Sequence, residues 1–180
     1  DKEFQSEVLL AAFELLKESD GPVIRDFPES VCVEGGEPLQ CELPPRFNAD
    51  LHPAVDEAQA LRAAYDRAYQ SSNKTSLGMR IGAQEVPDAL AKFVKIADGE
   101  NWESVGFSAE SMYGTVHDIR SYYEELACEL AQGPIAPWAT EEWFYDQTEA
   151  GGIILKARRA MRDSNVAPSL WFGLAPAGRE

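Results

Sequence analysis

Several side chains that can take part in chemistry share one side of a predicted helix over residues 108–132: Tyr113, His117, Arg120, Glu124 and Cys128. At about 100° per residue these positions lie within roughly 80° of one another, beside the apolar seam of the helix. Histidine, tyrosine and glutamate can transfer protons near neutral pH, and an arginine can hold an anionic substrate. The pattern therefore predicts a candidate catalytic set: Tyr113, His117, Arg120 and Glu124.

The same residues also fit the polar side that any long surface helix presents to water. His117 and Glu124 are seven positions apart, so their spacing alone implies no direct contact. Tyr113 fits the edge of the core, and Cys128 fits a small buried apolar residue. The sequence leaves both interpretations open.

A second place for chemistry is the start of another predicted helix, where His52 precedes Asp56 by four residues. A histidine and a carboxylate at this spacing are compatible with a metal site, so His52 and Asp56 are the candidate metal ligands. Pro53 biases His52 away from helical geometry, which favours a simple flanking role. The sequence does not decide whether a metal is bound.

Cys32 and Cys41 flank a Gly-Gly-Glu-Pro turn in the segment VCVEGGEPLQCEL, residues 31–43. A β-hairpin centred on this turn places the two cysteines opposite each other, with Cβ atoms about 4.5 to 5.5 Å apart. Their spacing does not match Cys-x-x-Cys metal or redox motifs. Three cysteines in the whole chain indicate free thiols in a reducing compartment, so we expect a packing hairpin in a cytoplasmic protein.

Composition and missing motifs exclude several classes of function. No phosphate-binding glycine loop, dinucleotide fingerprint or Gly-x-Ser-x-Gly elbow occurs, so the sequence indicates no nucleotide cofactor. The formal net charge of −15 disfavours nucleic acid and anionic membranes as partners. The one basic cluster lies where it complements the dipole of a predicted helix end: Lys156, Arg158, Arg159 and Arg162. No apolar run is long enough to cross a membrane.

Helical periodicity dominates the rest of the chain and predicts helices over 3–18, 52–70, 85–97, 108–132 and 140–163. Gly151 and Gly152 interrupt the last of these, either as a kink or to admit a neighbouring backbone. We therefore predict a mainly α fold, a helical bundle of about five helices in a single domain over 1–180. One short β-hairpin (31–43) lies within an irregular, proline-rich arm (21–53), and an apolar tail (164–180) is non-helical.

The arm and the tail supply more adhesive surface than an isolated domain usually displays. The sequence therefore predicts a small acidic helical subunit or partner protein of a larger complex, joined to a homo- or hetero-oligomeric protein partner through 21–53 and the tail. The alternative is a stand-alone enzyme that acts on a small molecule by acid/base chemistry from the side of the helix carrying Tyr113, His117, Arg120 and Glu124. Whether the protein is an enzyme stays open at this point.

Overall fold

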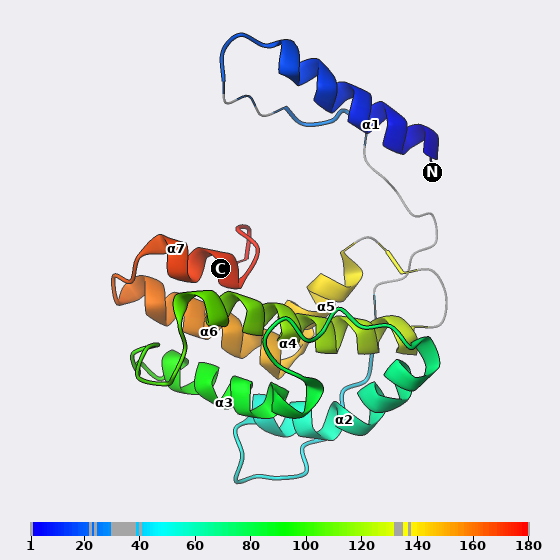
Figure 1. Ribbon diagram of the computed structural model, residues 1–180. Helices are drawn as coiled ribbons and strands as arrows, with labels where there is room; N and C mark the ends of the chain where they lie inside the picture. Colours follow the sequence, from blue (N-terminus) through cyan, green and yellow to red (C-terminus); the bar gives the residue numbers. More distant parts are fainter. Residues whose placement is uncertain are drawn as a thin grey trace. The chain divides into compact units, whose positions relative to one another are not determined.

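The computed structural model describes residues 2–21, 23, 25–29, 39, 41–131, 135–136 and 138–179 (Figure 1). Contacts within the chain form two compact units, Asp1–Cys32 and Val33–Glu180. Each unit has its own internal packing, and the single domain stays a prediction.

The first unit contains helix α1 (Lys2–Glu14), which continues into the 3-10 turn η1 (Leu15–Lys17). The two elements confirm the helix predicted over 3–18. Phe4 packs edge-to-face against Phe27, with ring centroids 5.7 Å apart, so the segment after the helix returns along one side of it.

The described part of the second unit contains six α-helices, which confirms a mainly helical fold. Their bounds are α2 (Pro53–Ser72), α3 (Val86–Ala97), α4 (Ala109–Leu130), α5 (Ala139–Gln147), α6 (Glu149–Asp163) and α7 (Pro168–Trp171), with 3-10 turns η2 (Ala83–Glu85) and η3 (Phe172–Leu174). None of these helices, nor α1, combines the length and the apolar composition that crossing a bilayer requires.

The predicted β-hairpin finds no support, because the described residues contain no strand. Leu39 and residues 41–43 belong to the segment 31–43 and are not part of a strand. The remainder of the segment, including Cys32, lies outside the described residues.

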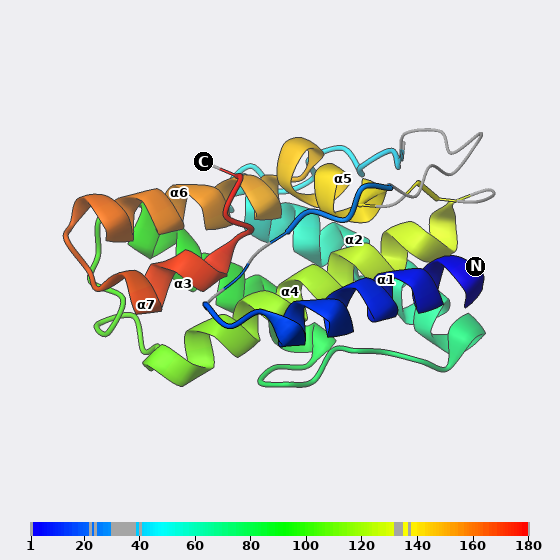
Figure 2. The same ribbon diagram turned by 90° about the horizontal axis from the view of Figure 1, so that it is seen from above.

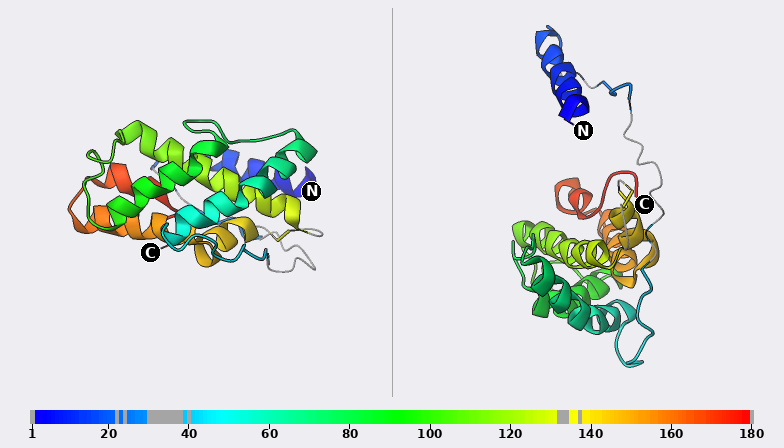
Figure 3. Two further views of the ribbon diagram at one scale, coloured as in Figure 1. Left: turned by 90° about the horizontal axis from the view of Figure 1, so that it is seen from below. Right: turned by 90° about the vertical axis from the view of Figure 1, so that its right-hand side faces the viewer.

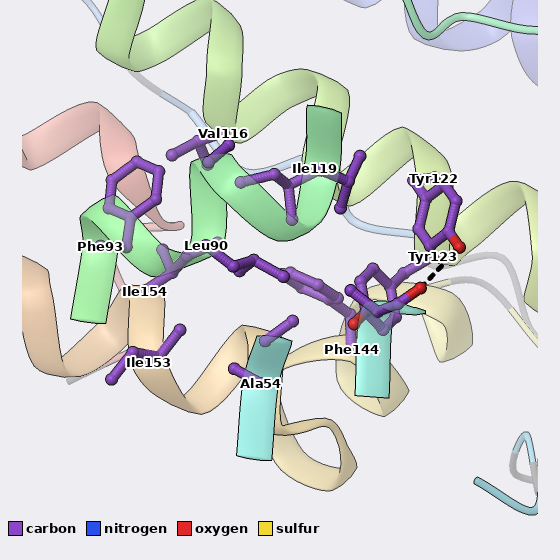
Figure 4. Close-up of a cluster of buried hydrophobic side chains, with 14 of the residues drawn as sticks. Ala54, Leu90, Phe93, Val116, Ile119, Tyr122, Tyr123, Phe144, Ile153 and Ile154 are labelled. Carbon is purple, nitrogen blue, oxygen red and sulfur yellow. Dashed lines mark hydrogen bonds between the residues drawn. The ribbon is translucent and has the colours of Figure 1, made fainter. Parts of the chain in front are cut away.

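The helices of the second unit pack as a bundle around one core. Helix α6 lies against α2, α3 and α5, while α4 packs against α2 and α5, as Figures 2 and 3 show from different sides. Figure 4 shows Leu90, Phe93, Ile119 and Ile154 among the side chains of this core, and each is almost completely buried. Burial of these apolar faces is the main force that holds the helices together.

The region predicted as one helix over 140–163 is two helices, which corrects the sequence prediction. The chain breaks at Thr148, whose backbone is extended, and not at the two glycines. Thr148 donates its hydroxyl hydrogen to the carbonyl of Phe144 (2.6 Å) and accepts from the N–H of Gly151 (2.9 Å). The side chain therefore closes one helix and caps the next.

Of the two roles considered for Gly151, a helix kink or close contact with a neighbouring backbone, the structure shows the second. A Cβ placed on Gly151 would lie 2.0 Å from the carbonyl oxygen of Phe144. The start of α6 therefore packs against the end of α5 at a separation that only glycine permits. Gly152 has no neighbour within 4 Å of such an atom.

Within the second unit, the described arm residues from Leu39 onward and the tail both fold onto the helices. The backbone N–H groups of Phe47 and Asn48 donate to the two carboxylate oxygens of Asp56, at 3.0 and 3.1 Å. The tail, predicted to be non-helical, contains the single turn α7 and the turn η3, because Pro168 fits a first helical position. Leu174 in this tail is buried in the core.

Candidate functional site

The four predicted catalytic residues line one pocket of about 420 Å³ between α4 and residues 173–176. Ser108 accepts from the N–H of Ser111 and so caps the start of α4, while Met112, Val116 and Ile119 are buried in the core and orient the helix. Gly173 closes the pocket at the Tyr113 ring, where an added Cβ would lie 3.3 Å away. The grouping expected from the helical wheel is present, and the catalytic role stays a prediction.

Arg120 in this pocket is already paired with two carboxylates. Its Nη2 lies 2.8 Å from Glu124 and 3.3 Å from Glu141 of α5. The guanidinium also lies over the ring of Tyr145, 5.5 Å from its centroid. An anionic substrate would have to displace these partners, so the role of Arg120 as an anion holder is not favoured.

His117 lacks the partner that would orient it for proton transfer. Its Nδ1 is buried without a hydrogen-bond partner among the described residues; it lies 3.6 Å from Oδ1 of Asp118, an ion-pair distance that is too long for a hydrogen bond. Among the described residues no hydrogen bond joins His117 to Tyr113 or to Glu124. The pocket therefore contains groups that can act as acid or base, but no described hydrogen bond connects them for proton transfer.

Tyr145 lies behind the pocket, between two arginines. Arg120 and Arg179 both stack on its ring, and its hydroxyl donates to the carbonyl of Leu174 at 3.4 Å. Burial raises the pKa of Tyr145 to about 12, against the opposing effect of Arg120. The phenol therefore stays protonated at neutral pH and serves to anchor the tail.

Asp118, which sequence reasoning missed, is the most heavily bonded side chain beside the pocket. It is 0% exposed, and its oxygens accept the backbone N–H groups of Gly78, Met79, Arg80 and Ile81 at 2.6 to 2.9 Å. Burial alone would raise the pKa of Asp118, but the backbone donors outweigh burial and hold it below its usual value. The carboxylate fixes the loop before α3 onto α4.

Cys128 does not reach the pocket of Tyr113 and His117. It lines a second pocket of about 500 Å³, together with Tyr65, Glu125 and Thr75. Tyr65 and Thr75 share a hydrogen bond of 3.0 Å, and Glu125 accepts from the N–H of Ser76. Burial, followed by Glu124 and Glu125, raises the pKa of the Cys128 thiol, which lowers its reactivity.

The candidate metal ligands are both occupied by backbone groups. His52 accepts the N–H of Ala54 through Nδ1 at 3.2 Å, as an N-cap of α2, while Asp56 binds the arm. Burial lowers the pKa of His52. Within the described ranges no group of three His, Cys, Asp or Glu residues is placed to hold a metal ion. The structure gives no support to a metal site at His52 and Asp56.

Cys41 lies against α4. Its thiol donates to the carbonyl of Ala127 at 3.9 Å, and both Cys41 and Cys128 are free thiols. Burial and the nearby Cys128 raise the pKa of Cys41. Both observations fit the packing role expected for Cys41.

Comparison with known proteins gives no match: no protein-family model, no curated protein and no solved structure is similar to the chain.

Proposed function

We propose that this chain is a small acidic helical subunit or partner protein of a larger complex. It binds its partner through the apolar stripe of α1 and η1, defined as Leu9, Phe13 and Leu16, with contributions from residues 21–53 and the tail. The single observation that carries the proposal is the exposure of these side chains: 57% for Leu9, 61% for Phe13 and 80% for Leu16.

The spacing of the apolar stripe supports recognition by a groove. Positions 9, 13 and 16 follow the i, i+4, i+7 pattern of helices that lie in an apolar groove of a partner. Leu10, beside the stripe, is also 64% exposed, and no residue of α1 is buried. Large apolar side chains gathered on one side of a helix mark an interaction surface more than a solvated one.

The charge of the chain favours a different protein as partner over a second copy. Two chains of formal net charge −15 repel each other, whereas a basic protein surface is attracted. The free thiols of Cys41 and Cys128 support a cytoplasmic location for the complex.

The tail supports the proposal less than α1 does. Leu174 is buried and Trp171 donates its indole N–H to the carbonyl of Val166 at 3.0 Å, so both are used within the chain. Phe172 contacts Trp171 and Arg158 but stays half exposed, so part of its ring can still contact a partner.

Replacing Phe13 by aspartate is expected to weaken partner binding by about 30-fold or more, because aromatic anchors at the centre of an interface contribute about 2 kcal/mol or more each. The protein is purified with its partner from native cells, and affinity is measured with the purified partner. The matched control is Glu7→Gln, which also changes one charge on α1 but lies about 120° around the helix from Phe13 and farther from Leu9 and Leu16. Equal affinities for F13D and E7Q would overturn the proposed surface.

The second candidate function is an enzyme, favoured by one observation: Tyr113, His117, Arg120 and Glu124 line a single pocket. If acid/base chemistry occurs there, His117→Gln abolishes conversion of a substrate while the melting temperature changes little, since Nδ1 of His117 makes no hydrogen bond among the described residues and has only the 3.6 Å contact with Asp118 to lose. The measurement is mass spectrometry of a metabolite extract incubated with wild type or variant. Conversion by H117Q at the wild-type rate rules this candidate out.

A further inference from the structure

A small basic pocket lies between α6 and the C-terminal segment, outside the site described above. Its volume is about 220 Å³, and its lining includes Arg158, Arg159, Arg162, Arg179, Trp171 and Phe172. The helix supplies three of these arginines, and the folded tail adds the fourth together with both rings. In a chain of net charge −15, this is a local reversal of the overall field.

Only two of the four arginines are neutralised by nearby carboxylates. Arg162 pairs with Asp163 at 3.2 Å, and Arg179 pairs with Asp146 at 2.6 Å and with Glu141, which it shares with Arg120, at 3.7 Å. Arg158 and Arg159 have no acidic partner in the part of the chain that the structure describes. Among the described residues, the guanidinium groups of Arg158 and Arg159 are therefore left without a paired carboxylate at the pocket.

Arg158 supplies an independent sign that a ligand is expected. The residue is only 7% exposed, and its Nε is buried without any acceptor. Its Nη1 donates to the carbonyls of Pro176 and Arg179, and its guanidinium lies 5.7 Å from the Trp171 ring centroid and 5.8 Å from that of Phe172. A buried cation with an unused donor is costly unless an anion compensates it.

We propose that this pocket binds the phosphate group of a small phosphorylated molecule. Two uncompensated guanidinium groups match the charge of a phosphomonoester, about −1.5 to −2 at neutral pH, better than that of a single carboxylate. The planar guanidinium fork also suits phosphate oxygens. The volume is an order of magnitude above the ~10–15 Å³ that one water needs, so atoms beyond the phosphate fit beside the exposed edge of Phe172.

Calorimetric titration of the whole chain with three probes tests the proposal: phenyl phosphate, inorganic phosphate and benzoate. Phenyl phosphate binds most tightly. Inorganic phosphate binds more weakly because it lacks the ring, and benzoate binds least because its carboxylate carries only one negative charge. Arg159→Gln weakens phenyl phosphate about tenfold, the effect of one lost charge-assisted hydrogen bond. Arg159 is exposed and has no ion pair within the described residues, so this variant keeps the fold, whereas substitution of Arg158 also removes contacts of the tail.

Lys156→Gln is the matched control, since Lys156 is an exposed cation of the same helix that does not line the pocket. Wild-type affinity in K156Q together with the loss in R159Q supports the site. If both variants lose affinity for phenyl phosphate equally, the overall charge attracts the anion and the proposal is overturned. The absence of phenyl phosphate binding at millimolar concentration also overturns it. Inorganic phosphate binding as tightly as phenyl phosphate identifies free phosphate as the ligand and overturns the assignment of a phosphorylated molecule.

Discussion

Replacing Gly151 by alanine is expected to lower the free energy of unfolding by about 3 kcal/mol, the upper end for overpacking a well-packed interior. The added Cβ would lie 2.0 Å from the Phe144 carbonyl oxygen and 2.8 Å from the Cα of Tyr145. Both are backbone atoms, so no side chain can rotate away and the two helices must separate. Urea denaturation followed by circular dichroism measures the loss.

The neighbouring glycine provides a control of identical chemistry. Gly152 has open space where the methyl group of an alanine would lie, so Gly152→Ala stabilises α6 by about 0.5 to 1 kcal/mol through higher helix propensity. The two substitutions should therefore shift the urea midpoint in opposite directions. A G151A variant as stable as G152A contradicts the close contact between α5 and α6.

Removal of the Asp118 carboxylate is expected to cost about 3 kcal/mol, because four backbone N–H groups lose a buried charged acceptor and one hydrogen bond to a charged group is worth about 1.5 to 3 kcal/mol. Asp118→Ala leaves the N–H groups of residues 78–81 without their acceptor, while Asp118→Asn keeps one oxygen and loses about half as much. Hydrogen exchange at these amides should accelerate in both variants. The control is Asp163→Asn on the exposed end of α6, which leaves the loop unchanged.

The pH dependence of stability gives Asp118 a second signature. Because its folded pKa lies below the usual 3.8, its contribution is fully present above about pH 4 and is lost as the pH falls through the depressed value. Below pH 4 the free energy of unfolding should fall more steeply for wild type than for D118N. Parallel acid curves for the two proteins, or unchanged exchange at residues 78–81, would show that the carboxylate does not hold the loop.

The helices α1, α2, α3 and α4 were predictable from the sequence because each has apolar residues that repeat at helical spacing. The same reasoning placed Tyr113, His117, Arg120 and Glu124 on one side of α4, and they do line one pocket. The break at Thr148 was missed because the apolar spacing continues through it. A threonine followed by Glu149 is a common helix start, and this signal could have located the break.

The hydrogen bonds and ion pairs of the candidate site were not predictable, because the residues that each of them joins are distant in the sequence. Asp118 receives its donors from 37 to 40 residues away, and nothing nearby distinguishes it from the other carboxylates. The pairing of Arg120 with Glu141 bridges 21 residues and two helices. Periodicity determines which side of a helix a residue occupies, while tertiary packing determines what that residue contacts.

The central claim, that the chain is a subunit of a larger complex, is tested most directly by the mass of the native particle. Tagged protein purified gently from its own cells is weighed by mass photometry or native mass spectrometry. The proposal predicts a particle heavier than the 19.9 kDa of this segment and the tag combined, with a second protein in fixed stoichiometry that is absent from the F13D preparation. A particle with the mass of the single tagged chain, identical for wild type and F13D, would contradict it.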